Sequence, residues 1–286
     1  MILVVGATGQ LGGMITRLLR SQGEDVRVLV RGDSDYAGLE AAGAEPVQGD
    51  LKDAGSLVRA CDGVERVITT ANSARRGGKD NVQAVEIEGN RNLINAAARA
   101  DVEQFVFVSA FGAQPHSPSE FARGKAEAER YLRGSGVPYT ILKANVFMEV
   151  WIGMIVAAPV QERRAVTVVG EGLRKHSFVS IQDVASFAVA VLRQPQALNR
   201  TLAIGGPEPI SWRDIVQLAE QMIGREIPLR HVAPGEPLPG LPPVVSGLAA
   251  AFDAFDSPIE MDETTRTYDV TLTPVDVVLS RMLAGA

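Results

Sequence analysis

This sequence contains few of the residues on which disulfide-rich and metal-binding proteins depend. Cys61 is the single cysteine among 286 residues, so no disulfide can form within the chain, and a buried place near the end of a helix is expected for its thiol. The three histidines are isolated from one another, and no group of His, Cys or carboxylate side chains has the spacing of metal ligands. We therefore predict no metal site.

Long apolar runs and runs of one charge are missing as well. The longest clearly apolar stretch, WIGMIVAAPV at 151–160, has about half the length that a membrane span requires. The net charge is −6, and the densest basic cluster is Arg75, Arg76 and Lys79 in a glycine-containing loop. These features argue against nucleic acid or a membrane as the partner. Because MILVV at 1–5 leads straight into a glycine motif, it predicts a strand and not a signal peptide, and a cytoplasmic location is expected.

The first half of the chain alternates short β-branched runs with helical patterns, which is typical of βαβ units. Strands are predicted at 2–5, 26–30, 46–49, 66–70, 104–109 and 139–143. Helices are predicted near 10–22, 53–61, 80–99 and 119–134. The strands are almost continuously apolar, which indicates burial on both faces. The pattern predicts an α/β fold with a doubly wound parallel sheet and helices on both faces.

The pattern is looser after residue 145. Short strands are predicted in AVTVVG, HSFVSI (176–181) and RTLAIGG, and a helix is predicted in QDVASFAVAVL. Ser211 and Asp214 have the spacing of a capping box, which predicts the start of another helix. The stretch at 233–243 contains five prolines and no periodicity, so it is either a linker or a lid over a site.

Three glycines in VVGATGQLGG come directly after a predicted strand and at the start of a predicted helix. In this variant of a phosphate-binding turn, Gly6 permits the tight turn, Gly9 lets the backbone approach a pyrophosphate, and Gly12 lets the helix pack close to the strand. The backbone N–H groups of Thr8 to Leu11 and the helix dipole would face the phosphates. The motif in this context predicts a dinucleotide cofactor.

The choice of dinucleotide depends on the end of the second predicted strand. A NAD site normally has Asp or Glu about 20 residues after the glycines, whereas this sequence has Arg31 immediately after VRVLV. A guanidinium suits a 2′-phosphate, so NADP(H) is predicted, although Arg31 could also be an ordinary solvated loop residue. Asp33 lies two residues too far along the chain to be the obvious ribose ligand.

Two further loops follow predicted strands at the edge of the sheet where ligands bind. In the loop GDL at 49–51, Asp50 is either an acceptor for the adenine amine or the N-cap of the next helix. In the loop TTAN at 69–72, small residues would let a cofactor lie flat against the backbone.

The stretch SPSEFARGKAEAERYL at 117–132 predicts a helix with Ser119 as its N-cap. Phe121 and Lys125 are four residues apart and therefore share one face of this helix. Lys125 is either a functional residue or a solvated lysine paired with Glu129, one turn further on. His116 in the preceding loop could donate a proton near neutral pH, although most loop histidines are solvated.

Several motifs in order resemble the NmrA-like family of atypical short-chain dehydrogenases/reductases. They are GATGQLGG, Arg31, GDLKDAGSL, FVFVSAFGA, Lys125 and YTILKANVFME. The family includes quinone oxidoreductases, triphenylmethane reductase and isoflavone-reductase-like enzymes. The resemblance implies a Rossmann domain at 1–150 that binds NADP(H). It also implies a smaller α+β substrate or lid region at 151–286, with some strands and helices that return to the Rossmann core.

The resemblance also implies roles for individual residues. Ser109 and Ala110 would lie near the nicotinamide, Lys125 would contact its ribose, and the turn at 145–147 would line the pocket. With the motifs above, the predicted cofactor contacts are Gly6, Thr8, Gly9, Gln10, Leu11, Gly12, Arg31, Asp50, Leu51, Thr70, Ala71, Asn72, Ser109, Ala110, Lys125, Ala144 and Asn145. The predicted substrate pocket is lined by Phe111, Phe121, Phe147, Met148 and Trp151. The predicted catalytic residues are Lys125 and Ser109.

One departure from the superfamily pattern limits the chemistry. Reductases of the wider superfamily carry a Tyr proton donor four residues before the Lys, and this sequence has Phe121 there. The first hypothesis is therefore an NADPH-dependent reductase that transfers hydride to an electron-poor acceptor, such as a quinone or a conjugated ring, whose anion solvent can protonate. The second is a non-catalytic NADP(H)-binding redox sensor, regulator or assembly factor. The expected substrate is a hydrophobic small molecule, and the sequence leaves a homodimer open.

Overall fold

The computed structural model of the chain describes residues 1–74, 77–241 and 243–284. The chain forms two compact units. Unit 1 comprises residues 1–143, 184–203 and 268–270, and unit 2 comprises residues 144–183, 204–267 and 271–286. The chain first leaves unit 1 after Lys143, a few residues before the expected boundary at 150, and it returns to unit 1 twice.

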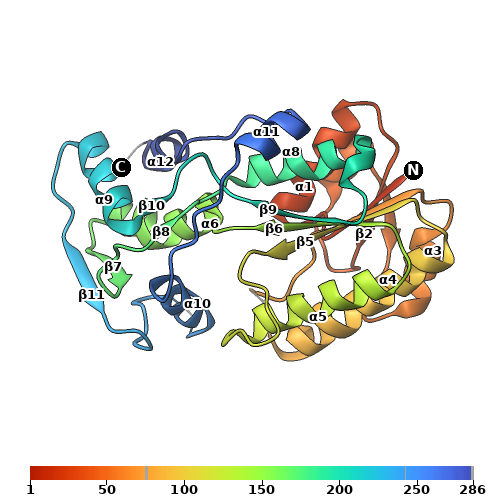
Figure 1. Ribbon diagram of the computed structural model, residues 1–286, viewed down its shortest axis with the longest axis horizontal. Helices are drawn as coiled ribbons and strands as arrows, with labels where there is room; N and C mark the ends of the chain where they lie inside the picture. Colours follow the sequence, from red (N-terminus) through yellow and green to blue (C-terminus); the bar gives the residue numbers. More distant parts are fainter. Residues whose placement is uncertain (75–76, 242, 285–286) are drawn as a thin grey trace. The chain divides into compact units, whose positions relative to one another are not determined.

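Unit 1 is built around a seven-stranded sheet in the order β3-β2-β1-β4-β5-β6-β9 (Figure 1). Its strands are β1 (Ile2–Val5), β2 (Val26–Val30), β3 (Glu45–Gln48), β4 (Arg66–Thr69), β5 (Gln104–Ala110), β6 (Tyr139–Ala144) and β9 (Arg200–Ile204). Strands β1 to β5 pair in parallel, with Val5 opposite Leu29 of β2 and Thr69 of β4. The strand order reverses between β1 and β4, and ligands of doubly wound sheets bind at this switch point.

Helices cover both faces of this sheet, with α1 and α8 on one face and α3, α4 and α5 on the other (Figure 1). The helices are α1 (Gln10–Ser21), α2 (Ala37–Ala41), α3 (Ala54–Cys61), the π-helix η2 (Gln83–Gly89) that continues into α4 (Asn90–Arg99), α5 (Glu120–Gly134) and α8 (Ile181–Ala190). Single 3-10 turns occur at η1 (Gly78–Asp80), η4 (Val191–Arg193) and η5 (Pro195–Ala197). Unit 1 therefore has the predicted Rossmann-like α/β fold. Across the described residues of both units, no helix is long and apolar enough to cross a membrane.

Burial explains why the first half of the chain follows its periodicity. All four residues of β1 and six of the seven residues of β5 are buried, because helices cover both faces of the sheet. The predicted N-cap of α5 is confirmed, since the Ser119 side chain accepts a hydrogen bond from the backbone N–H of Ala122. Cys61 is fully buried at the end of α3, and this burial raises the pKa of its thiol to about 11.

Unit 2 consists of shorter elements. They are α6 (Met148–Ile152), the π-helix η3 (Gly153–Ala157), α7 (Ala158–Gln161), β7 (Val166–Val169), β8 (Lys175–His176), β10 (Ile210–Ser211), α9 (Trp212–Ile223), β11 (Leu229–Val232), α10 (Pro243–Asp253), α11 (Asp262–Tyr268) and α12 (Val275–Leu283). β7 pairs with β11 in parallel, and β8 pairs with β10 antiparallel. The strand predicted at 176–181 is wrong beyond His176. The backbone turns there, with the N–H of Phe178 bonded to the carbonyl of His176, and α8 begins at Ile181.

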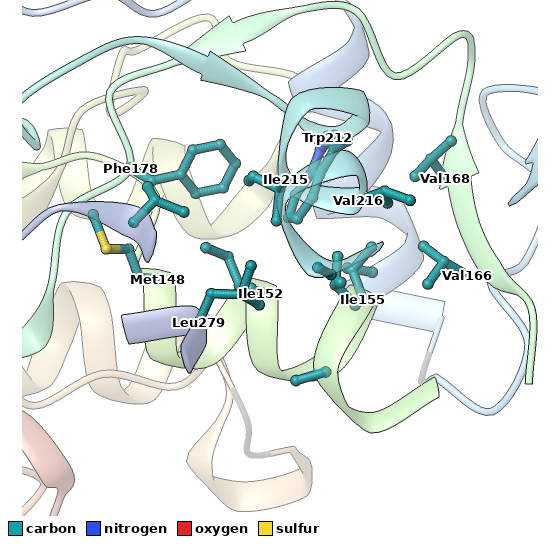
Figure 2. Packing of buried hydrophobic residues seen from close by; sticks show 14 of the residues in the cluster. Met148, Ile152, Ile155, Val166, Val168, Phe178, Trp212, Ile215, Val216 and Leu279 are labelled. Carbon is teal, nitrogen blue, oxygen red and sulfur yellow. The ribbon is translucent and has the colours of Figure 1, made fainter. Parts of the chain in front are cut away.

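A separate apolar core fills unit 2 (Figure 2). Side chains of α6, α9 and the segment after β8 point into it, including Ile152, Phe178 and Trp212. The rings of Phe178 and Trp212 meet edge to face with their centroids 4.9 Å apart. The predicted capping box at the start of α9 is confirmed. The Ser211 hydroxyl accepts from the N–H of Asp214, and the Asp214 carboxylate accepts from the N–H of Ser211.

The proline-rich stretch at 233–243 lies within unit 2, apart from residue 242, which is outside the described residues. Leu238 is buried in the core of this unit, and its N–H donates a hydrogen bond to the hydroxyl of Ser246 on α10 at 3.0 Å. A segment packed in this way inside one unit is not a linker between domains. Its role as a lid stays a prediction.

Candidate functional site

The glycine turn between β1 and α1 lies at the switch point of the sheet. Gly6 has a φ angle of +85°, and a Cβ atom there would lie 2.7 Å from Thr70 Oγ1. A Cβ atom on Gly12 would lie 2.3 Å from the carbonyl oxygen of Gly6, so only glycine fits at either position without a shift of the backbone. Gly9 is the N-cap of α1 and has no side chain to accept hydrogen bonds from the first turn. These N–H groups are therefore available to an anion, and the turn fits a pyrophosphate.

The other residues predicted to contact the phosphates are accessible. Thr8 and Gln10 are exposed, and Leu11 is half-buried. The N–H group of Gly9 closes the turn by donating to the carbonyl of Gly6 at 3.1 Å. The N–H groups of Gln10 and Leu11 belong to the first turn of α1, where no intrahelical acceptor exists.

The loop after β4 packs beside this turn. The N–H of Thr70 donates to the carbonyl of Val5 at 2.9 Å, so the loop continues the pairing of β4 with β1. The Asn72 side chain stabilises the loop, because it donates to the carbonyl of Thr70 and accepts from the N–H of Ala74. The carbonyl of Ala71 accepts a hydrogen bond from Lys125 Nζ at 3.4 Å. The structure thus brings the predicted residues Thr70, Ala71 and Asn72 together with the glycine turn.

Lys125 is buried on α5 and forms an ion pair with a residue outside the sequence motifs. Its side chain is 4% exposed, and its Nζ lies 3.0 Å from Oε2 of the fully buried Glu86. The same nitrogen donates to the carbonyl of Val108 at 3.3 Å. Glu86 Oε1 accepts from both the N–H and the hydroxyl of Ser73, at 2.7 and 3.1 Å. The alternative of a solvated lysine paired with Glu129 is therefore wrong.

A π-helical turn presents Glu86 to Lys125. The helix predicted at 80–99 begins as η2, and the Asn90 side chain donates to the carbonyls of Val85 and Glu86 at 3.1 and 3.0 Å. π-helical turns of this kind occur often at functional sites. Next to Lys125, a Cβ atom on Gly124 would lie 2.6 Å from Val82 Cγ1, so glycine lets α5 approach η2 closely.

Two phenylalanine rings lie close to the ammonium group of Lys125. Its Nζ lies 4.8 Å from the ring centroid of Phe107 on β5 and 5.7 Å from that of Phe121 on α5. At these distances both rings can stabilise the cation through their π-electrons. Phe121 therefore packs near Lys125 and presents an apolar wall without a proton to exchange. His116, the candidate proton donor in the preceding loop, is exposed.

Ser109 near the end of β5 is bonded to a second buried carboxylate. Its hydroxyl donates to Glu129 Oε1 at 2.5 Å, and Ser109 is 5% exposed. Glu129 also forms ion pairs with Arg133 (Nη2 to Oε2, 2.9 Å) and with Lys143 (Nζ to Oε1, 3.3 Å). A hydroxyl has one hydrogen to donate, and here Glu129 accepts it. The next two predicted residues, Ala110 and Phe111, are half-buried.

The residues predicted for the adenosine end lie in the loops after β2 and β3. Arg31 Nη1 donates to the Asp80 carboxylate at 2.8 Å. Asp50 is not the N-cap of α3, because Asp53 has that position, and Asp50 Oδ1 instead accepts from the N–H of Lys52 at 2.9 Å. Leu51 is buried, and its carbonyl accepts from an α4 side chain. The basic pair at 75–76 lies outside the described residues.

Ala144 and Asn145 belong to unit 2 and are buried. The Asn145 amide donates to the carbonyl and the hydroxyl of Ser257 at 2.9 and 3.1 Å. His176, fully buried, lies 2.7 Å from the Ser257 hydroxyl through Nδ1 and 3.0 Å from the carbonyl of Phe252 through Nε2. Because only a protonated Nε2 can bond a carbonyl, the neutral imidazole uses Nδ1 as an acceptor. Burial lowers the pKa of His176 and favours this neutral form.

The three aromatic and apolar residues predicted for the substrate pocket in unit 2 differ in burial. Met148 is fully buried in the core of the unit, and Phe147 and Trp151 are half-buried. The ring of Trp151 meets that of Phe252 edge to face, with centroids 4.7 Å apart. Their contact with a substrate stays a prediction.

Glu86 is the site residue that the motifs do not reveal. It shares one helical face with Asn90 and Leu93, both of which are buried. The sequence signal for Glu86 is a charged residue at a helix position where buried apolar residues are expected. Such a side chain is rarely buried without a partner. The identity of that partner depends on how α5 packs against η2.

The chain is similar to known proteins in sequence and in fold. The photosystem II assembly factor Ycf39 of Cyanophora paradoxa is 32% identical over 231 residues, which are 81% of this chain and 71% of that protein. The NAD(P)H azoreductase of Xenophilus azovorans is 31% identical over 233 residues, 82% of this chain and 77% of the relative. The NADPH-dependent quinone oxidoreductase QOR2 of Escherichia coli, in complex with NADPH, shares the fold with a TM-score of 0.81 at 22% identity over 99% of both chains. The model of the NmrA-like family matches residues 1–273, so the resemblance is confirmed and the chain belongs to the NmrA-like family.

Proposed function

We propose that the chain is an NADPH-dependent reductase that transfers hydride to an electron-poor acceptor, such as a quinone or another conjugated ring. The glycine turn carries this proposal, because it admits no Cβ atom at Gly6 or Gly12 and leaves N–H groups available to a pyrophosphate. Family membership supports it. The names of two similar proteins, an NAD(P)H azoreductase and an NADPH-dependent quinone oxidoreductase, point to the same class of chemistry.

The chain's own residues would bind and orient the dinucleotide, whose nicotinamide supplies the hydride when bound. In this proposal the glycine turn holds the pyrophosphate, and Arg31 holds the 2′-phosphate. Lys125 contacts the nicotinamide ribose, and its bonds to the carbonyls of Ala71 and Val108 tie the loop after β4 to β5. Glu86 is then a positioning residue, because it fixes the ammonium of Lys125.

The surroundings of Lys125 restrict the acceptor. Phe121 cannot donate a proton, and the Ser109 hydroxyl already donates to Glu129. An acceptor whose reduced form is a stabilised anion needs no acid from the protein, because solvent can protonate it. We therefore favour quinones and conjugated rings over simple ketones, with the substrate a hydrophobic small molecule.

A non-catalytic NADP(H)-binding regulator or assembly factor is the second candidate. One observation favours it: both predicted catalytic side chains are bonded to buried carboxylates, Lys125 to Glu86 and Ser109 to Glu129. The Cyanophora paradoxa relative is named as an assembly factor. In this case the bound dinucleotide would shift the population of a state that binds a partner.

Turnover separates the two candidates. Purified full-length protein is first titrated with NADPH by calorimetry, and its consumption of NADPH is then followed by absorbance with a panel of quinones, azo dyes and triphenylmethane dyes. A reductase oxidises NADPH with at least one acceptor and at a rate proportional to enzyme concentration. Tight binding of NADPH without consumption by any acceptor would overturn the reductase proposal and leave the second candidate.

A further inference from the structure

Three loops at the carboxyl edge of the sheet in unit 1 meet at one carboxylate. Arg31 follows β2 directly, and its Nη1 lies 2.8 Å from Asp80 Oδ2. Lys52 follows β3, and its Nζ donates to the other oxygen, Oδ1. Asp80 itself ends η1 in the segment after β4, and its side chain is 14% exposed. One carboxylate therefore holds both of these cations.

The ionised form of Asp80 is strongly favoured. Hydrogen bonds from Lys52 and then Arg31 hold the pKa of Asp80 at about 2, although partial burial opposes them. At any physiological pH this side chain is therefore a full negative charge. Charge-assisted hydrogen bonds of this kind are about twice as strong as neutral ones.

The 2′-phosphate of NADPH would need the same two donors, Arg31 and Lys52. An arginine and a lysine that converge on one anion form a typical phosphate-binding pair. Further negative charge surrounds them, since Asp33 lies 3.8 Å from Arg31 Nε and Asp50 lies 3.6 Å from Lys52 Nζ. Of the described side chains in these contacts, two are cations and three are carboxylates. A 2′-phosphate must therefore displace Asp80 or stay beside it as a like charge.

We propose that Asp80 determines the discrimination between NADPH and NADH, because its carboxylate occupies the position of a 2′-phosphate between Arg31 and Lys52 and competes with it. NADH has a hydroxyl in that position and meets no such competition. The preference for NADPH that Arg31 implies is thus reduced by Asp80. This inference rests on the proposed binding of a nicotinamide dinucleotide.

The variant Asp80→Asn tests the competition, since it keeps the shape of the side chain and removes its charge. Dissociation constants for NADPH and NADH are measured by calorimetry on the full-length protein. We expect NADPH to bind about tenfold more tightly to this variant, because one like charge at contact distance is removed from a partly screened site. NADH affinity should change less than about twofold. Asp80→Ala repeats the test without an amide that could bond to Arg31.

Asp33→Asn is the matched control, because Asp33 also lies near Arg31 but is 79% exposed. Because solvent screens its charge, this variant should change the ratio of the two affinities by less than about twofold. The inference is overturned if Asp80→Asn weakens NADPH binding, if it changes both affinities alike, or if Asp33→Asn has the same effect. If the wild-type protein binds both dinucleotides and the Asp80 variants keep the wild-type ratio of NADPH to NADH affinity, only this inference is overturned. Wild-type protein that binds neither dinucleotide overturns the proposed function as well.

Discussion

Among single residues, the buried pair of Lys125 and Glu86 constrains the site most strongly. Both side chains are at most 4% exposed, and burying two charges costs several kcal/mol before their attraction is counted. Additional bonds offset this cost, from Ser73 to Glu86 and from Lys125 to two carbonyl oxygens. Such a pair adds little net stability over an apolar pair, but loss of one partner leaves an uncompensated charge.

Glu86→Gln should therefore lower the free energy of unfolding by about 3 kcal/mol or more, because Lys125 stays buried without a counter-ion. The double variant with Lys125→Met should recover most of this loss, since neither charge remains. Urea denaturation measures both changes. Glu127→Gln on α5, the helix of Lys125, is the control, because Glu127 pairs with the exposed Arg130 and its loss should cost less than about 1 kcal/mol. If Glu86→Gln and Glu127→Gln lowered the free energy of unfolding equally, this result would contradict a buried ion pair of Lys125 and Glu86.

The sequence is informative about single residues only where the chemistry is local. Phe121 and Lys125 are one helical turn apart, so helix geometry predicts that they lie close together. The structure confirms this. The Lys125 partner comes from another helix, and Asp80 joins loops that follow three different strands. Such pairs depend on tertiary packing, which no local pattern encodes.

Among the elements, most strands and the longer helices of residues 1–143 were predictable because they are buried along a regular stripe or on both faces. The five-residue helix α2 was not predicted, and the predicted strand β3 has no buried residue. The π-helix η2 was not, because it depends on a side chain, Asn90, that bonds to carbonyls in the preceding turns. The bounds of the short strand β8 were also missed, since Phe178 and Val179 continue the β-like pattern after the backbone has turned at His176. Local pattern therefore locates long elements and fails where a tertiary contact changes the backbone.

The turn between β1 and α1 supports a prediction about one element. Gly12→Ala should destabilise the protein by about 1–3 kcal/mol and weaken NADPH binding, because the added Cβ atom meets the backbone of Gly6 and not a flexible side chain. Thermal unfolding and NADPH titration measure the two effects. Gly134→Ala at the end of α5 is the control, since nothing lies within 4 Å of its added Cβ atom. This control should leave binding unchanged and stabilise the helix by up to about 1 kcal/mol.

For the whole molecule, the two units differ in how their cores are assembled. The core of unit 1 comes mostly from consecutive strands and helices of residues 1–143. The core of unit 2 combines side chains that are far apart in the sequence, among them Met148, Trp212 and Leu279 (Figure 2). The first half of the sequence therefore predicted the sheet and its covering helices in unit 1. The second half predicted some helices and strands of unit 2 but not how they pack together.

The buried histidine of unit 2 should make the stability of the protein depend on pH. Burial lowers the pKa of His176 below its ordinary value of 6.5, while the Phe252 carbonyl and Asp256 oppose this shift and Arg174 adds to it. In the pH window between 6.5 and the lower folded-state pKa, the unfolded chain binds a proton that the folded protein does not. The contribution of His176 is thus complete above the upper limit of this window and is lost as the pH falls through it. The loss amounts to about 1.4 kcal/mol for each unit of difference between the two pKa values.

Urea denaturation of the wild type and of His176→Gln between about pH 8 and about pH 5.5 measures this contribution. Glutamine can still hydrogen-bond near Phe252 and Ser257 but cannot titrate, so the variant should lose less stability on acidification. Burial raises the pKa of Glu149, which therefore adds stability as the pH falls, with the opposite sign to His176. Because Glu149 is present in both proteins, the difference between the two curves isolates the histidine. Parallel curves over this range would show that His176 accepts a proton as readily in the folded state as in the unfolded chain, and would contradict a buried neutral imidazole.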